Sequence, residues 1–229
     1  MSIVPNFGRP GIGPSKSAAH GFVSQDGQLT YLPGGGVIDG AKSRDVANSD
    51  NQRALRAGLL MGKVTASGKW ANCFLGATQS AYTSGGTTLS LTAAAAVELV
   101  RRVGSSGTFL LIGPASAAGS NNSTTVTYSA VNTSTGDVTI TNIGANRIAG
   151  CLVAQGDGSG IPKSFIPDGL GELVSDISPY DVNFPRIPIG GILRVDKILD
   201  WPSDTTLKTY IRESLSTLSG GKFTFTDQY

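Results

Sequence analysis

The sequence predicts a mainly β protein with two short helices. Within this class we expect a small β-barrel-like or sandwich-like core, an inserted β-α-β-β-β module and an extended N-terminal arm. Charged residues make up only 15% of the 229 residues, whereas 31 residues are glycine and long stretches consist of Ser, Thr and Ala. This composition is more typical of strands and turns than of helices. Only two stretches have the apolar spacing of a helix, and the other apolar runs are short.

Residues 1–50 are predicted to form the arm because they are rich in proline and glycine. Proline removes a backbone donor and glycine weakens regular elements. The arm contains Pro5, Pro10, Pro14, Pro33 and the triplet Gly34-Gly35-Gly36. Ordering so long a segment by itself would cost much conformational entropy. The arm is therefore expected either to be disordered or, as we favour in a chain full of strands, to lie on a partner subunit.

Two local elements are predicted in the arm and just after it. Asp26-Gly27 is a strong signal for a tight turn, so we expect a hairpin that joins residues 21–23 to residues 29–31. Residues 43–56 are expected to hold a short helical turn capped by Ser49 or Asp50.

The stretch 55–72 is predicted to lie at the centre of the core domain, which comprises residues 51–76 and 148–229. It combines a dense apolar run with glycines at which the backbone can bend or turn. We predict one strand, a bend at Gly62, a second strand piece and a tight turn at Ser67-Gly68. The strand expected at 148–154 is the predicted pairing partner of this stretch.

Residues 77–147 are predicted to form the inserted module, because strand-like segments are separated there by segments of turn residues. Its strands are expected at 87–91, 108–112, 124–131 and 137–142. The last two strands are joined by a loop that ends at Gly136, which can take a positive φ. The surface of this module is rich in Ser, Thr and Asn.

The helix of the module is predicted over residues 92–104. Thr92 is a good N-cap and Gly104 stands where a left-handed residue ends a helix. Arg101 and Arg102 fall in the last turn, where they complement the helix dipole. The predicted apolar face consists of Ala96, Val97, Val100 and Val103.

The C-terminal part is predicted to close the core with a strand, a helix and a final strand. Residues 187–195 are expected to form a core strand that is broken or bulged at Gly190-Gly191. A helix is expected after Trp201, with Ser203 as its cap. Its apolar stripe consists of Leu207, Tyr210, Ile211, Leu215 and Leu218. Residues 222–226 alternate cleanly and predict the last strand.

The charge pattern argues against nucleic acid and membranes as partners. The formal net charge is +2, and nucleic-acid binding requires clustered Lys and Arg. The pairs Arg53/Arg56 and Arg101/Arg102 are interpreted as solvated faces or helix-end features. No run approaches the ~18 apolar residues of a membrane helix, and the first residues lack the regions of a signal peptide. We therefore expect a soluble protein made in the cytosol.

The cysteines and the histidine offer no metal site. Cys73 and Cys151 both lie in apolar, strand-like contexts without a neighbouring ligand residue, so two buried thiols are the default interpretation. Their spacing alone does not argue for a disulfide. His20 is the single histidine and lies in the arm, which excludes a His-based triad or a multi-His metal site within one chain.

Three patterns are similar to sites of known chemistry, and each departs from its template. Residues 58–64 approach a phosphate loop, but three residues separate the glycines and a valine stands where magnesium needs a hydroxyl. Asp157-Gly158-Ser159-Gly160 has a single carboxylate and lacks the later Glu of a calcium loop, so a turn is expected. Asp168 and Glu172 could pair as glycosidase carboxylates, but the glycines around them are typical of a turn. The sequence thus predicts no enzyme, no cofactor and no metal.

One stretch resembles a known family. Ala57-Gly58, continued by Gly62-Lys63-Val64-Thr65-Ala66-Ser67-Gly68-Lys69-Trp70, resembles the core signature of the bacteriophage head decoration proteins (lambda protein D-like). That signature is an apolar strand, Gly-Lys-Ile/Val-Thr, a Ser-Gly turn, and then Lys and an aromatic residue. Residues 149–153 are similar to the strand that follows in the family, and residues 207–218 and 223–226 to its closing helix and strand. Residues 77–147 would be an insertion, and the arm is longer than the family's.

The resemblance implies a trimeric virion protein that binds the outside of the capsid and clamps neighbouring subunits of the major capsid protein. In this interpretation the arm makes the contacts, which bury apolar area, and the module at 77–147 projects outward. The candidate contact residues are Phe7, Arg9, Pro10, Phe22 and Tyr31. Repetition around a trimer would add avidity.

Two other functions stay open at this level. The chain could be another virion component, such as a tail or head fibre protein. A carbohydrate-active enzyme that uses Asp168 and Glu172 is a third alternative.

Overall fold

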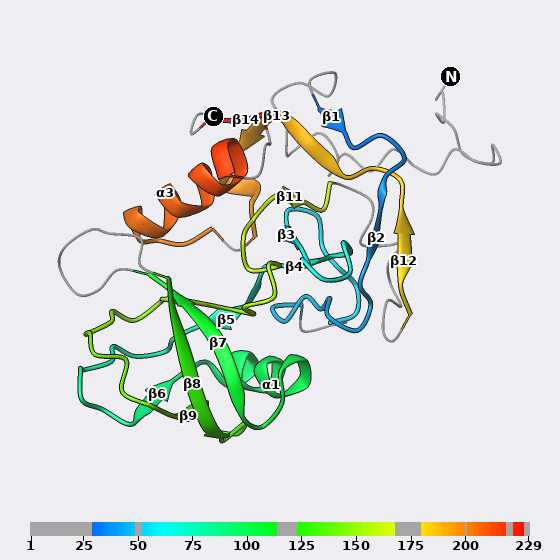
Figure 1. Ribbon diagram of the computed structural model, residues 1–229. Coiled ribbons are helices and arrows are strands. Elements are labelled where there is room, and N and C mark those ends of the chain that lie inside the picture. The colour runs from blue at the N-terminus through cyan, green and yellow to red at the C-terminus, as the bar shows by residue number, and fades with distance from the viewer. Residues whose placement is uncertain are drawn as a thin grey trace, which may run out of the picture.

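The computed structural model describes residues 29–48, 52–113, 123–167, 180–199, 201–218 and 222–226. This part of the chain contains three β-sheets, two α-helices, a 3-10 turn (Val195–Lys197) and a π-helical turn (Ser214–Leu218). Figure 1 shows how the labelled helices and strands are arranged. The prediction of a mainly β protein with two helices is confirmed. Each of the three sheets of the described residues is open, so the barrel-like form of the core is wrong.

The largest sheet has six strands, and all its neighbouring strands are antiparallel. Its order is β5 (Phe74–Ala77), β10 (Leu152–Ala154), β7 (Gly107–Ile112), β8 (Ser123–Val131), β9 (Asp137–Ile140) and β6 (Thr88–Ser90). The strands expected in the inserted module therefore form, and Gly136 takes the expected positive φ of 87°. Two strands of the sheet, β5 and β10, come from the flanking chain, so the sheet extends beyond the module's predicted limits.

The second sheet contains the strands of the predicted core stretch 55–72. Its order is β11 (Ser164–Phe165), β3 (Leu60–Lys63), β4 (Trp70–Asn72), β2 (Gly36–Ile38) and β12 (Val182–Phe184). The predicted pair of strands forms as β3 and β4, joined by a turn at which Gly68 has a φ of 71°. The predicted pairing with 148–154 is wrong, because β11 and β4 occupy both edges of β3 while β10 pairs with β5 and β7.

Gly62 has a different role from the predicted bend. It lies inside β3, opposite Ala71, and its φ is not positive. A Cβ at this position would overlap the backbone carbonyl of Ser159. Glycine is therefore needed here because the turn at 157–160 packs directly on the strand.

The third sheet joins the start and the end of the described chain. Its order is β1 (Thr30–Tyr31), β13 (Pro188–Arg194) and β14 (Lys222–Thr226), with β13 and β14 parallel. β13 runs unbroken through Gly190 and Gly191 along β14, and its register shifts against β1 between Gly190 and Pro188. β1 pairs with β13. The predicted hairpin joins this strand to residues 21–23, which lie outside the described residues.

Helix α1 (Ala93–Arg102) begins and ends as predicted. Thr92 accepts a hydrogen bond from the backbone N–H of Ala95, and Gly104 has a φ of 122°. The predicted apolar face is wrong in part: Val97 is 49% exposed, whereas Ala95, Ala96 and Leu99 are buried together with Glu98. The buried face differs from the predicted one because it includes Glu98, whose carboxylate is paired with Arg101 and Arg102 as described below.

Helix α3 (Thr205–Glu213) also forms, but its cap differs from the predicted one. Asp204, not Ser203, accepts hydrogen bonds from the backbone N–H groups of Thr206 (2.9 Å) and Leu207 (3.0 Å). Among the described residues, no helix is both long and apolar enough to cross a membrane. Residues 43–48 and 52–56 contain turns and a bend but no assigned helix, and the predicted caps Ser49 and Asp50 lie outside the described residues.

One buried cluster connects all three sheets. Leu60 of β3, Phe74 of β5 and Leu193 of β13 pack together with Leu207 and Ile211 of α3. A second cluster lies between α1 and the six-stranded sheet, and a third lies within the five-stranded sheet. The shared cluster gives the three sheets a common interior, which burial of apolar area stabilises.

Candidate functional site

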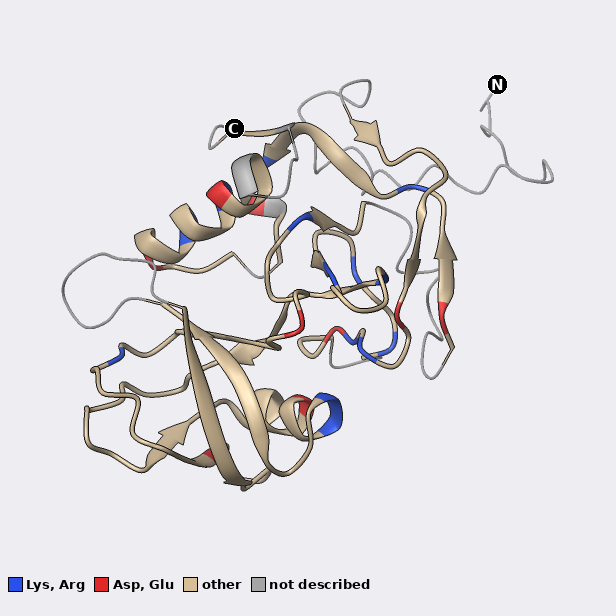
Figure 2. Ribbon diagram, in the orientation of Figure 1, with Lys and Arg blue, Asp and Glu red and all other residues tan. Residues whose placement is uncertain are grey.

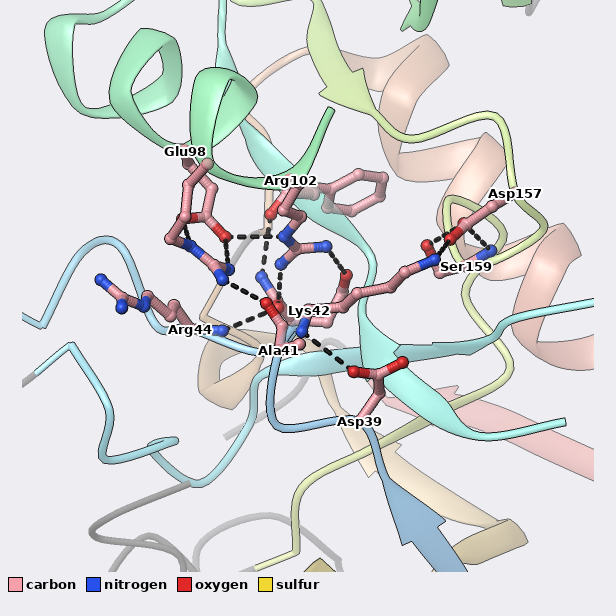
Figure 3. A network of polar contacts seen from close by, with 11 residues as sticks. Asp39, Ala41, Lys42, Arg44, Glu98, Arg102, Asp157 and Ser159 are labelled. Atoms are coloured by element: carbon pink, nitrogen blue, oxygen red, sulfur yellow. Dashed lines mark hydrogen bonds and ion pairs between the residues drawn. The ribbon is translucent and has the colours of Figure 1, made fainter. Parts of the chain in front are cut away.

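Charged side chains gather where the end of α1 meets the segment after β2. Figure 2 shows Lys, Arg, Asp and Glu concentrated there, whereas β7 and β8 contain no charged residue. We call this group the anchor network (Figure 3). It consists of Asp39, Lys42, Arg44, Asn72, Glu98, Arg101, Arg102, Asp157 and Ser159.

Glu98 and Arg102 form the buried centre of the anchor network. The Arg102 side chain is 0% exposed and its Nε donates to Glu98 Oε1 at 2.6 Å. Arg101 donates from Nε to Glu98 Oε2 at 2.7 Å. Burial lowers the pKa of Arg102, and the Glu98 carboxylate counteracts this shift. Of the two predicted interpretations, Arg102 is therefore a helix-end feature and not part of a solvated face.

The network continues into the segment that follows β2. Arg102 donates from Nη1 to the carbonyl of Asn72 at 3.1 Å and from Nη2 to the Asn72 side-chain oxygen. The same oxygen accepts the backbone N–H of Arg44 at 3.1 Å. Arg101 donates from Nη1 to the carbonyl of Ala41. The residues from 41 to 44 are thus held against both α1 and β4.

A second attachment lies on the other side of this segment. Lys42 forms an ion pair with Asp157, and Asp157 also accepts the backbone N–H of Ser159 at 3.0 Å. Burial alone would raise the pKa of Asp157, but the hydrogen bonds from Lys42 and Ser159 outweigh it, so the pKa is lowered. The sequence 157–160 is therefore a turn, as predicted, and its carboxylate is used for a structural ion pair.

Two further ion pairs hold the neighbouring chain. Arg56 makes a two-pronged contact with Asp45, at 2.6 Å from Nε and 3.0 Å from Nη2, and the Asp45 side chain is 1% exposed. Lys69 contacts Asp181 at 2.6 Å, with both side chains more than a third exposed. Arg56 is thus part of a partly buried pair and not of a simple solvated face.

A small cavity adjoins the anchor network. Its volume is about 150 Å³, and Arg44, Asn72, Phe74, Thr92 and Ala95 are among the residues that line it. Burial, followed by the nearby Arg101, lowers the pKa of Arg44. The cavity is smaller than the roughly 300–1,000 Å³ of pockets for drug-sized ligands, so it has room only for a small ligand or water.

Of the five predicted contact residues, the structure describes Tyr31. Its ring is half-buried, and the guanidinium carbon of Arg186 lies 5.3 Å from the ring centroid. Such a cation–π contact holds the ring in place. Phe7, Arg9, Pro10 and Phe22 lie outside the described residues, so the contact set stays a prediction.

The other candidates for chemistry are placed as follows. Lys63 is exposed at the end of β3, within a strand and not a phosphate-binding loop. Cys73 and Cys151 are buried free thiols, as predicted, and burial raises the pKa of Cys151. The predicted pair Asp168 and Glu172, like His20, lies outside the described residues. Among the residues that the structure describes, no three His, Cys, Asp or Glu side chains gather as metal ligands.

Glu98 and Asn72 are the central acceptors of the anchor network, and neither was predicted as such from the sequence. One signal was available: Glu98 stands three and four positions before Arg101 and Arg102, the spacing of ion pairs on a helix. The contact of both arginines with residues 41 and 72 depends on the tertiary fold and has no local signal.

Comparison with known proteins gives no relative. No protein-family model, curated protein or solved structure matches the chain significantly.

Proposed function

We propose that this chain is a non-catalytic structural protein of a bacteriophage virion, which decorates and stabilises the capsid by binding the outer surface of the major capsid protein. The observation that carries the proposal is the resemblance of residues 57–70 to the decoration-protein signature. In support, these residues form β3, the turn at Gly68 and β4, with β3 and β4 largely buried. A helix and a strand at the C-terminus, α3 and β14, parallel the family's closing elements.

The anchor network supports a mechanical role for the N-terminal part. The residues from 39 to 45 are tied to α1, β4 and the turn at 157–159 by ion pairs and hydrogen bonds. A segment that binds a partner transmits force only if its base is fixed to the folded domain. The proposal assigns this function to the network, with residues 1–28 as the part that contacts the capsid.

The proposal includes a homotrimer and a location on the outside of the virion. The six-stranded sheet has few charged residues, and β7 and β8 have none. This composition suits a surface that contacts another protein or is exposed outside a cell better than one that binds nucleic acid. Three copies around one axis would each add a weak contact, and their sum would hold the protein to the shell by avidity.

The test is a truncation that leaves the described fold intact. Because Thr30–Tyr31 pair with β13, the deletion should remove residues 1–28 only. We expect the truncated protein to keep its cooperative unfolding transition and to lose binding to expanded capsids that lack the protein, measured by co-sedimentation and electron microscopy.

A matched control is Thr127→Ala, which changes an exposed residue of β8 in the outward-projecting module. This variant should bind like the unaltered chain. Undiminished capsid binding by the truncated protein would overturn the role of the arm. Assembly of the purified chain into long filaments or tubes would favour the alternative, a tail or head fibre component.

A further inference from the structure

Arg147 is a buried cation at the end of the six-stranded sheet. Its backbone N–H and C=O each bond to Tyr82, at 2.9 Å in both directions. These bonds fix the residue next to the sheet, where it is only 3% exposed. Its side chain therefore cannot reach bulk water, and its donors must be satisfied inside the protein.

The guanidinium of Arg147 is only partly bonded. Nη2 donates to the hydroxyl of Thr124 in β8, whereas Nε and Nη1 are buried and have no hydrogen-bond partner among the described residues. Arg102 shows the contrast: all three of its guanidinium nitrogens donate, to Glu98 and Asn72. Two buried charges of the same type are thus treated differently by the fold.

Arg147 also has no negative partner in the part of the chain that the structure describes. The charge of Arg147 acts on the nearby Cys151. Burial nevertheless raises the pKa of this thiol, so it is protonated at neutral pH. The Asp204 carboxylate, which also acts on Cys151, caps α3. Residues 114–122, which lead into β8, contain no Asp or Glu. The ion pairs of the described residues do not include Arg147.

An unpaired charge in the interior is strongly unfavourable, and a water molecule does not remove that penalty. Water can accept from an N–H group, but it does not neutralise the guanidinium. An anion does both. The Thr124 hydroxyl accepts from Nη2 and still has its own proton to donate, so it would serve as a further donor to an anion beside the guanidinium.

We propose that Arg147 is the core of a binding site for a small inorganic anion of the size of chloride. Nε and Nη1 each offer a free donor, on different edges of the guanidinium, so the anion binds at one of these edges, and the Thr124 hydroxyl lies at Nη2, which belongs to both edges. The burial of the side chain selects for a small, compact anion over an organic carboxylate. The bound anion neutralises the charge at the point where β8 begins, and it stabilises this end of the six-stranded sheet.

The test compares thermal unfolding in sodium chloride and in sodium gluconate at the same ionic strength. Gluconate is an organic anion much larger than chloride, so the pair of salts separates binding from screening. A ligand that binds only the folded state raises the melting temperature as its concentration rises. We expect a rise of about 3 °C for the full chain in saturating chloride. Equal melting temperatures in the two salts would overturn the proposal.

Two variants make the comparison specific. Arg147→Met keeps most of the side-chain volume without the charge, and its melting temperature should not respond to chloride. It should equal or exceed that of the unaltered chain in gluconate, because it removes an unpaired buried charge. Lys69→Met removes an exposed positive charge and should keep the full response. A response to chloride in Arg147→Met would place the anion elsewhere and overturn the assignment.

A direct measurement covers the case in which Arg147→Met does not fold. Crystals of the full chain grown in sodium bromide should show an anomalous-scattering peak at hydrogen-bond distance from Nε or Nη1 of Arg147. Density for water at this position without an anomalous signal would overturn the proposal.

Discussion

Arg102 is held by charge and hydrogen bonds on every nitrogen of its guanidinium, in a position without solvent. Loss of one partner from a buried ion pair leaves the other charge uncompensated, which costs about 3–5 kcal/mol. We expect Arg102→Met to lower the free energy of unfolding by this amount, as measured by urea denaturation.

The surface pair Lys69–Asp181 provides the comparison for Arg102. Both of its side chains are more than a third exposed, and solvent screens such pairs. Lys69→Met should leave the urea midpoint nearly unchanged. If Arg102→Met and Lys69→Met behave alike, the buried charges of the anchor network do not contribute as described. Adding Glu98→Gln to Arg102→Met should cost less than the sum of the two single changes.

Gly62 tests whether the close approach of strand and turn is required. A Cβ at this position would overlap the Ser159 carbonyl, which belongs to the backbone and cannot rotate away. We expect Gly62→Ala to destabilise the protein by about 1–3 kcal/mol, measured by thermal unfolding. Gly156→Ala is the matched control, because its Cβ would meet only Leu110 at 3.8 Å. A neutral Gly62→Ala would contradict the packing of the turn on β3.

At the level of single elements, the cap of α3 depends on one of two neighbouring residues, Asp204 and not Ser203. Asp204 accepts from two backbone N–H groups, whereas Ser203 is exposed. Loss of an N-cap side chain costs about 0.5–2 kcal/mol. Asp204→Ala should therefore destabilise the protein within this range, and Ser203→Ala should leave the melting temperature almost unchanged. The reverse order of effects would restore Ser203 as the cap.

The same element shows why the cap was difficult to predict. Ser203 and Asp204 are both good capping residues, and periodicity places a helix boundary only to within a residue or two. The apolar stripe at Leu207, Ile211 and Leu215 was predictable because it follows helical spacing, and all three residues are buried. In α1 the spacing was less informative, since small residues fill the first turns and Glu98 is buried by virtue of its arginine partners.

At the scale of the whole molecule, the Lys42–Asp157 pair links segments that are 115 positions apart in sequence. The pKa of Asp157 is lowered in the folded state, so its contribution to stability is complete above its unfolded pKa of about 3.9 and is lost as the pH falls below that value. We expect Asp157→Asn to reduce the free energy of unfolding at pH 7 by about 1–3 kcal/mol, since a charged hydrogen bond is removed.

The pH dependence provides the check for Asp157. Between pH 5 and pH 2, Asp157→Asn should lose less stability than the unaltered chain, because it has one fewer carboxylate to protonate. Asp181→Asn, from the exposed pair with Lys69, should change the neutral-pH stability little. Parallel stability curves for Asp157→Asn and the unaltered chain would show that the ion pair does not couple to folding.

Features that depend on neighbouring residues were predictable from the local sequence. The mainly β class, the two helices, the turn at Gly68 and the loop ending at Gly136 follow from composition, periodicity and the positive φ that glycine accepts. The burial of both cysteines also followed from their local apolar context. Local sequence carries such signals because turns and helix ends satisfy their backbone groups within a few residues.

The way in which these elements combine depends on contacts between residues that are distant in sequence. β10 pairs with β5 and β7 and not with β3, because both edges of β3 are already occupied. The anchor network and the incompletely bonded Arg147 likewise depend on residues that are distant in sequence. Strand pairing and charge burial depend on how distant segments of the chain are arranged in space. A strand edge or a buried charge can pair with any suitable group that the fold places beside it.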